Sequence, residues 1–261
     1  VIAKMNLILH GIEGYQIFVG DSLTNPRFDH ADYVIANPPW NQDGYDEGNL
    51  GEPSVRRIYM SLGVSGFTPK NTADWAWIQL MSYYAGRKVG IVLDNGALFR
   101  GGREKNIRRA AVERDLIEAV ILLPEKLFYN TGAPGIILIL NKNKPEERKG
   151  KILFINASQE YEGHPEIRRL NVLAEKNIGR IVEAYRRFED VEGFAKVVSL
   201  DEIRRNDYNL NVTLYVYPKE EEEEIDLAKE LEEFEKIDVE EKEVIRKAIE
   251  YVRGVIEASQ K

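Results

Sequence analysis

The spacing of apolar and polar residues along the chain predicts alternating helices and strands. In some segments the apolar residues recur every three or four positions, as on one face of a helix, and in others they form the short continuous runs of buried strands. Helical spacing covers about residues 1–10, 72–86, 103–114 and 171–188, and strand-like runs cover residues 16–19, 33–36, 89–93, 117–122, 135–141 and 152–155. Such alternation is typical of an α/β protein with a doubly wound sheet.

Turn and capping residues add detail to this arrangement. Gly11 is placed to end the first helix, and Ser199, with Glu202 three residues later, is placed to cap a short helix. No helical segment separates residues 117–122 from 135–141, so we expect an antiparallel hairpin at the edge of the sheet. Residues 41–71 are polar and rich in Gly and Pro, which predicts a functional loop or a disordered segment.

The end of the chain differs from the rest in charge and pattern. Residues 218–261 carry 16 Asp and Glu against 8 Lys and Arg, whereas residues 1–217 carry 28 of each, so the tail accounts for the net charge of -8. Two apolar stripes predict two helices there, with Asp238 and Glu241 as a capping box between them. The stripes are Leu227, Leu231 and Phe234, and then Ile245, Ala248, Ile249, Val252 and Ile256. We therefore expect a body of residues 1–217 and an acidic helical tail of residues 218–261, which packs on a partner or back on the body.

Composition excludes several classes of protein. The chain has no Cys, and its three His are scattered, which argues against disulfides and a structural metal site. No apolar run is long enough to span a bilayer and no signal peptide is recognisable, so we expect a soluble cytoplasmic protein without a membrane partner. Basic residues that suit either DNA phosphate or a solvated helix face cluster at Arg100, Arg103, Lys105, Arg108 and Arg109.

Candidate chemistry is concentrated in Asn37-Pro38-Pro39-Trp40, directly after an apolar strand-like run. Ligands of open α/β sheets bind at the carboxyl ends of strands, where this tetrapeptide begins. The Asn37 side-chain oxygen and the Pro38 carbonyl can accept both hydrogens of an aromatic amine, which frees its lone pair to attack a methyl sulfonium. Trp40 offers a flat face on which an extruded base can stack. A glutamine amide would suit the same residues, and a Pro-Pro turn with a buried Trp is the purely structural alternative.

With several other segments, the tetrapeptide resembles the amino-group methyltransferases that use S-adenosylmethionine, and among them the modification subunit of type I restriction-modification systems. The resemblance covers most of residues 1–217 and rests on the order and spacing of short segments. These segments are residues 3–11 (AKMNLILHG), 20–23 (GDSL), 37–40 (NPPW), 89–96 (VGIVLDNG), 98–102 (LFRGG), 107–109 (IRR), 123–124 (LP) and 127–129 (LFY).

The resemblance implies a Rossmann-like methyltransferase fold and methylation of adenine N6 in double-stranded DNA, with S-adenosylmethionine as cofactor and residues 37–40 as the catalytic group. It also implies that Asp21, with Ser22 and Leu23, binds the cofactor, where Asp21 accepts from the adenine amino group. Phe128 and Tyr129 would border the target-base pocket and place a second aromatic ring opposite Trp40. The implied partners are a specificity subunit, docked through the C-terminal helices, and a restriction subunit; a second copy of the chain is the other recipient for the tail.

Other interpretations of these residues stay open. Residues 21–23 also suit a plain Asx turn, or an esterase in which Ser22 is the nucleophile. The esterase needs an Asp-x-x-His pair, whereas Tyr161 stands three residues before His164. Phe128 and Tyr129 also suit an ordinary core position, and we expect Asp94 and Asn95 to cap a helix.

One departure from the family concerns its cofactor site. The family has a glycine-rich turn and an acidic ribose-binding residue before the helix that corresponds to residues 1–10, and neither is found in this sequence. The glycines at positions 63, 66, 101 and 102 have the wrong spacing. We therefore expect a fragment that lacks the first strands and half of the cofactor site and binds S-adenosylmethionine weakly or not at all. A catalytically silent assembly or DNA-contacting module is the alternative to an enzyme.

Overall fold

The structure, a computed structural model, describes residues 1–62 and 66–217, and in the tail residues 231, 234, 237, 241–246 and 249. The chain divides into two compact units, Val1–Lys219 and Glu220–Lys261. The described tail residues are helical and exposed, Phe234 and Ile245 among them. The other stripe and capping positions, Leu227, Asp238, Ala248, Val252 and Ile256, lie outside the described residues. The tail helices and the boundary at residue 217 therefore stay predictions.

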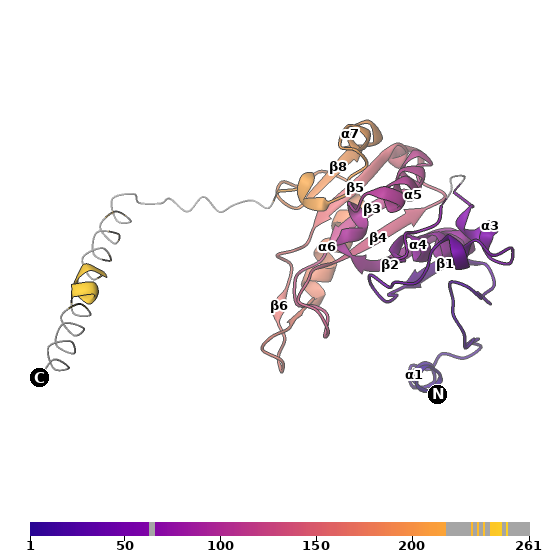
Figure 1. Cartoon of the computed structure of the whole chain (residues 1–261), viewed down its shortest axis with the longest axis horizontal. Helices are drawn as coiled ribbons and strands as arrows, with labels where there is room; N and C mark the ends of the chain where they lie inside the picture. The colour runs from indigo at the N-terminus through magenta and orange to yellow at the C-terminus, as the bar shows by residue number, and fades with distance from the viewer. Residues whose placement is uncertain are drawn as a thin grey trace, which may run out of the picture. The chain divides into compact units, whose positions relative to one another are not determined.

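A mixed six-stranded sheet forms the centre of the first unit (Figure 1), in the order β1-β2-β4-β3-β5-β8. Its strands are β1 (Ala31–Ala36), β2 (Ala85–Asp94), β3 (Ile117–Leu122), β4 (Gly135–Asn141), β5 (Lys151–Asn156) and β8 (Ala195–Ser199). β1 runs parallel to β2 and β3 runs parallel to β5, whereas β4 is antiparallel to both its neighbours and β8 is antiparallel to β5.

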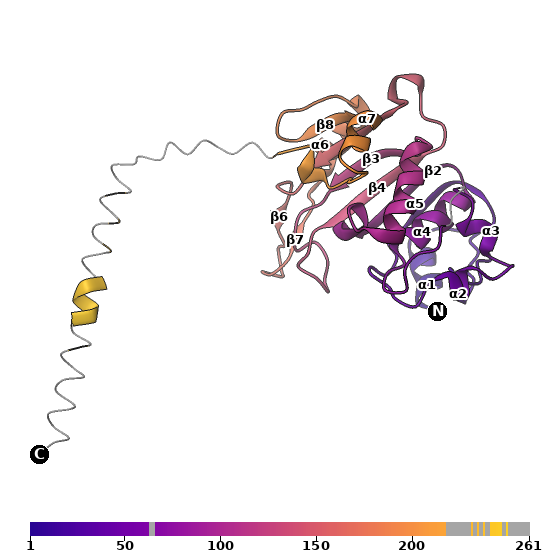
Figure 2. The same cartoon turned by 45° about the horizontal axis from the view of Figure 1, so that its top comes forward.

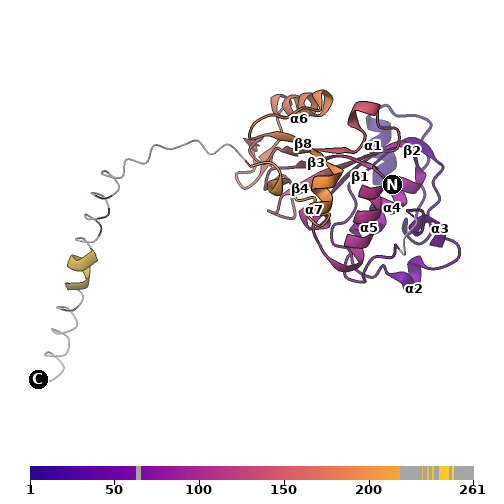
Figure 3. The same cartoon turned by 90° about the horizontal axis from the view of Figure 1, so that it is seen from above.

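Helices cover both faces of this sheet. The helices are α1 (Ile2–Leu9), α2 (Glu47–Leu50), α3 (Arg56–Tyr59), α4 (Asp74–Tyr84), α5 (Gly102–Glu113), α6 (Glu175–Arg187) and α7 (Leu200–Arg205), with short 3-10 turns at Asn95–Leu98, Glu146–Arg148 and Val212–Leu214. Figure 3 shows α4, α5 and α7 on one side and α6 on the other. Trp75, Ile107 and Ile203 bury their side chains in the first layer, and Ile181 and Ala184 in the second. This is the Rossmann-like methyltransferase architecture that the sequence predicted.

The hairpin of β3 and β4 lies inside the sheet, so its predicted place at the edge is wrong. β4 pairs with β3 on one side and with β2 on the other. All six residues of β3 are buried. A strand that is apolar on both faces is typical of the interior of a sheet, and this property of residues 117–122 was the signal that the edge prediction neglected.

Several other predicted elements also differ from the structure. Residues 16–19 form no strand, and Val19 is 90% exposed. Residues 41–71 contain α2 and α3, and Leu50, Ile58 and Phe67 form a small core together with Leu23 and residues of α4, so much of this stretch is ordered rather than irregular. Strand β8 was missed, and so was a two-stranded sheet, β6 (Glu162–Gly163) with β7 (Asn171–Val172), which lies away from α2 and α3 (Figure 2). Within the described ranges, no helix is long and apolar enough to cross a membrane.

The position of β1 matters for the site. It is an edge strand of this sheet and, of the described strands, pairs with β2 alone, and Tyr33 and Ile35 expose much of their side chains. Since β1 and β2 are parallel, both end at the same edge of the sheet, where β4 begins. Asn37, Asp94 and Gly135 are therefore brought to one edge.

Candidate active site

The tetrapeptide of residues 37–40 stands where the sequence placed it, at the carboxyl end of β1. Asn37 and Pro39 are exposed, Pro38 is buried and Trp40 is half-buried. The strand ends here because two successive prolines have no N–H to donate to a ladder. Asn37 thus presents a polar side chain at the edge of the sheet, on a backbone that Pro38 anchors.

Trp40 is held by two neighbours, Asn37 and Phe128. Its indole Nε1 donates to Asn37 Oδ1 at 3.3 Å. Its ring meets Phe128 edge to face, with 4.6 Å between the centroids and 72° between the planes. Gly135 leaves room for this pair, because a Cβ there would lie 2.7 Å from Phe128 and 2.9 Å from Trp40. The side chain at position 40 therefore has a fixed orientation.

This contact changes the role predicted for Phe128. A base stacked between two rings needs about 7 Å between them, roughly twice the 3.5 Å of one van der Waals contact. Phe128 and Trp40 are too close for that as they stand, and Phe128 orients Trp40; the place of Phe128 at the border of the target-base pocket stays a prediction. Tyr129 is 69% exposed, and its contact with a target base stays a prediction.

A polar network that sequence reasoning did not find fixes the residue after Trp40. Asn41 has a left-handed backbone, with φ 51°, and its N–H donates to Asp74 Oδ1 at 3.0 Å. Arg100 donates from one guanidinium nitrogen to Asn41 Oδ1 at 2.9 Å and to Asp94 at 3.2 Å. It also pairs with Asp74 and, at 2.6 Å, with Glu104. Arg100 therefore ties the turn after residue 40 to β2, α4 and α5.

Burial shifts the pKa values of the charged residues in and beside this network. Burial raises the pKa values of Asp74 and Glu104, although Arg100 opposes both shifts. Burial also lowers the pKa of the neighbouring Arg108 to about 10. The phosphate-binding role considered for the basic cluster is thus wrong for Arg100 and Arg108, because the first is held by carboxylates and the second is 1% exposed.

Asp21 forms the Asx turn that was one of its predicted readings. Its Oδ1 accepts from the backbone N–H groups of Leu23 at 2.9 Å and Thr24 at 3.3 Å, and its Oδ2 accepts from the Tyr45 hydroxyl at 2.9 Å. Burial works against ionisation, but these hydrogen bonds outweigh it and lower the pKa of Asp21. The carboxylate is therefore charged at neutral pH, and Tyr45 is a neighbour that the sequence did not indicate.

The residues beside Asp21 have different surroundings. Leu23 is fully buried, and its carbonyl accepts from Tyr59, so its side chain offers no surface to a ligand. Ser22 borders a cavity of about 520 Å³ whose other walls are largely apolar, among them Phe28, Trp77 and Tyr84. The cofactor-binding role of residues 21–23 stays a prediction, and any side-chain contact to a ligand would come from Asp21 and Ser22.

Two further expectations concern other chemistry. Asp94 caps the turn at Asn95–Leu98 through Gly96 N–H, as predicted, while the buried side-chain oxygen of Asn95 has no hydrogen-bond partner among the residues that the structure describes. His164 Nδ1 accepts from the N–H groups of Glu166 and Ile167, so this ring stabilises a local turn. Across the part of the chain that the structure describes, no group of acidic residues or histidines could hold a metal ion.

Comparison with known proteins gives consistent matches. The model of the N-6 DNA Methylase family matches residues 1–224. The type I restriction enzyme MjaVII methylase subunit of Methanocaldococcus jannaschii is 65% identical over 99% of this chain and 46% of its own length. The HindI methylase subunit of Haemophilus influenzae is 33% identical over 85% of this chain and 50% of its own length. Among solved structures, the type I methyltransferase subunit of Streptococcus thermophilus has a TM-score of 0.72 and 33% identity, and the match covers 82% of this chain and 46% of that one. The chain spans about half the length of the relatives it matches.

Proposed function

Since the chain belongs to the N-6 DNA methylase family, we propose that residues 37–40 accept an adenine base from DNA and promote methylation of its N6 amino group. The observation that carries this proposal is the exposed Asn37 at the carboxyl edge of β1, next to a Trp40 that is fixed from two sides. That edge is where open α/β sheets bind ligands.

Asn37 and Pro38 act on the amino group. An aromatic amine is a weak nucleophile because its lone pair is delocalised into the ring. The Asn37 Oδ1 and the Pro38 carbonyl accept its two hydrogens and favour a tetrahedral nitrogen, whose lone pair is then free. Oδ1 already accepts from Trp40, but a carbonyl oxygen has a second lone pair for the substrate. Acceptors fixed in advance stabilise charge that develops only in the transition state.

Trp40 supports the base. DNA enzymes that act on a base extrude it from the stack and hold it against an aromatic or apolar face. The edge-to-face contact between Phe128 and Trp40 holds the ring of Trp40 in its orientation before the base arrives. The Arg100 network holds the backbone one residue later. A preformed stacking face reduces the ordering that substrate binding would otherwise require.

The residues present fit part of S-adenosylmethionine, the proposed cofactor, which supplies an electrophilic methyl group when bound. Asp21 is ionised and exposed, and its Oδ2 accepts one hydrogen bond from Tyr45, which leaves a lone pair for an amino group. The apolar cavity beside Ser22, at about 520 Å³, has the size of a small-ligand pocket. These features support Asp21 and Ser22 as residues that hold the adenosine part.

We also propose that the chain works within a larger assembly on double-stranded DNA. The relatives are named methylase subunits of type I restriction enzymes, and a subunit implies companions. A specificity subunit would supply the DNA sequence preference and a restriction subunit would complete the complex. The acidic tail is the segment of this chain that we propose for subunit contact, because its apolar stripes need burial.

The experiment that tests this function identifies the product. The longest natural polypeptide that carries these residues is incubated with S-adenosylmethionine bearing a deuterated methyl group and with unmethylated DNA. Digested nucleosides and peptides are then analysed by mass spectrometry. We expect the label in N6-methyladenine. Label in glutamine side chains would contradict the proposal, and absence of any label would favour a silent assembly module.

A further inference from the structure

Two adjoining hollows lie at the end of the sheet opposite the candidate active site. Their volumes are about 510 Å³ and about 420 Å³, and both are lined by Arg114, Leu116 and Lys142. Lys142 Nζ donates to the carbonyl of Ala85, the first residue of β2, whereas Asp94 at the active site is the last. A strand of this length spans roughly 30 Å at about 3.3 Å per residue. The hollows are therefore distinct from the site of residues 37–40.

Some of the charges around the hollows are already neutralised. Lys144 is buried and pairs with Asp115 at 2.6 Å, and the second oxygen of Asp115 accepts from the N–H of Gly150. Lys149 pairs with Glu146 at 2.5 Å. Asp115 is the acidic residue in the lining, and its charge is balanced by Lys144. These pairs contribute no net charge to the hollows.

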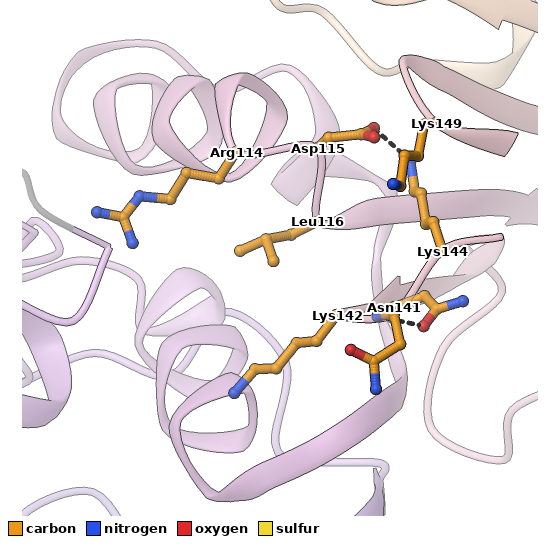
Figure 4. A pocket seen from close by; sticks show the side chains of 8 residues that line it. Arg114, Asp115, Leu116, Asn141, Lys142, Lys144 and Lys149 are labelled. Atoms are coloured by element: carbon orange, nitrogen blue, oxygen red, sulfur yellow. Dashed lines mark hydrogen bonds and ion pairs between the residues drawn. The ribbon is translucent and has the colours of Figure 1, made fainter. Parts of the chain in front are cut away.

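Arg114 and Lys142 are different. Among the described residues, neither has a carboxylate within ion-pair distance. Arg114 donates to the carbonyl of Ser61 at 3.1 Å and Lys142 to that of Ala85 at 2.7 Å, which leaves most of their N–H groups without a protein acceptor. Figure 4 shows Leu116 between the two side chains, with Arg114 on one side of it and Lys142 on the other. Two positive charges without counter-charges thus flank one apolar residue.

The second hollow adds a polar and an apolar feature. Ser61 lines it, and within residues 1–62 and 66–217 the buried Ser61 hydroxyl has no hydrogen-bond partner. A buried polar group without a partner is costly unless a ligand or water satisfies it. Leu62 and Tyr83 line the same hollow and offer an apolar and aromatic surface. An anionic group and a flat apolar group can therefore be bound side by side.

We propose that these hollows bind a nucleoside phosphate. Its phosphate lies between Arg114 and Lys142, where the planar guanidinium suits bidentate binding of phosphate oxygens, and the Ser61 hydroxyl donates to the same group. The base lies against Leu62 and Tyr83. Since α5 ends beside Arg114 and its carbonyl end repels anions, binding depends on the two side-chain cations. Each hollow has the volume of a typical small-ligand site.

Isothermal titration of the purified chain tests this site without reference to methyl transfer. The probes are ADP, pyrophosphate and adenosine at low salt. We expect ADP to bind more tightly than pyrophosphate, because the base adds contacts, and adenosine to bind at least about tenfold more weakly than ADP. Arg114→Met and Lys142→Met should each weaken ADP by about tenfold or more, which corresponds to about 1.4 kcal/mol.

Arg103→Met is the matched control, since Arg103 is an exposed residue of α5 with no ion pair among the described residues. It should bind ADP as the parent does, and all three variants should keep the melting temperature of the parent. ADP affinity unchanged in both Arg114→Met and Lys142→Met would overturn the proposal, as would equal affinity for ADP and adenosine. Binding of a short DNA duplex that both variants weaken, without binding of ADP, would also overturn it and assign the cations to a DNA backbone.

Discussion

Replacing Arg100 with Met tests the network behind the candidate site most severely. The side chain of Met fills part of the same space but donates nothing to Asp74 or Glu104, which are 0% and 1% exposed. Removal of one partner from a buried ion pair typically costs about 3–5 kcal/mol, because the remaining charge has neither water nor a partner. We expect Arg100→Met to lower the free energy of unfolding by that amount near pH 8.

The pH dependence of this loss gives a second check. Without Arg100, burial raises the pKa values of Asp74 and Glu104 further above their unfolded values. A carboxyl group with a raised folded-state pKa destabilises the protein increasingly as pH rises from its unfolded pKa to its folded pKa. The difference between variant and parent should therefore be largest near pH 8 and should shrink toward about pH 5, where the two carboxyls bind protons.

Urea unfolding followed by tryptophan fluorescence at about pH 5 and about pH 8 measures both effects. Arg103→Met, at an exposed position in the first turn of α5, should change stability by less than about 0.5 kcal/mol at either pH. A loss below about 1 kcal/mol for Arg100→Met at the higher pH, or a loss of the same size at both pH values, would refute the reasoning about buried charge.

Three further predictions concern other parts of the chain. Gly135→Ala should displace the Phe128–Trp40 pair, because the new Cβ would lie within 3 Å of both rings, and should lower methyl transfer with a visible shift in tryptophan emission. Hydrogen bonds and charge from Arg204 lower the pKa of Glu113 to about 2, so Glu113 stabilises the fold above about pH 4.5 and loses that effect as pH falls toward 2. Glu113→Gln should therefore make the melting temperature depend less on pH between about pH 5 and 3, and the change should be small because solvent screens this exposed pair. Deletion of residues 218–261 should leave the first unit folded by circular dichroism but abolish subunit association by light scattering, and an insoluble product would contradict the assignment of the tail.

Local patterns predicted most of the elements, because apolar period and turn residues act over a few positions. The strand before Asn37 and the helix capped by Ser199 are such cases, and both are confirmed. Strand pairing depends on residues far apart in the chain, so the place of β4 between β2 and β3 was missed. The four residues 16–19 have a strand pattern, but none of the described strands pairs with them, and a segment without a hydrogen-bonded neighbour does not form a strand.

The candidate site, like the fold, could be predicted from the sequence only in part. The position of residues 37–40 at a strand end follows from neighbouring residues and was predicted. The polar network that holds Asn41 joins residues up to 59 positions apart, and no local pattern marks Asp74 or Arg100 as partners. Arg100 in fact looked like a residue for DNA phosphate, because the sequence shows charge but not burial. The contact between Trp40 and Phe128 could not be predicted from the sequence either, because these two residues are far apart in the chain.

The most direct test of the proposed function is the turnover of Asn37→Ala in the longest natural polypeptide that carries these residues, with tritiated S-adenosylmethionine and unmethylated DNA. Loss of one fixed acceptor should lower kcat by about a hundredfold or more, while the affinity for S-adenosylmethionine stays unchanged. Asn106→Ala, at an exposed position of α5, is the control and should retain full activity. Equal turnover of Asn37→Ala and the parent would contradict the account, because Asn37 would then not act on the amino group.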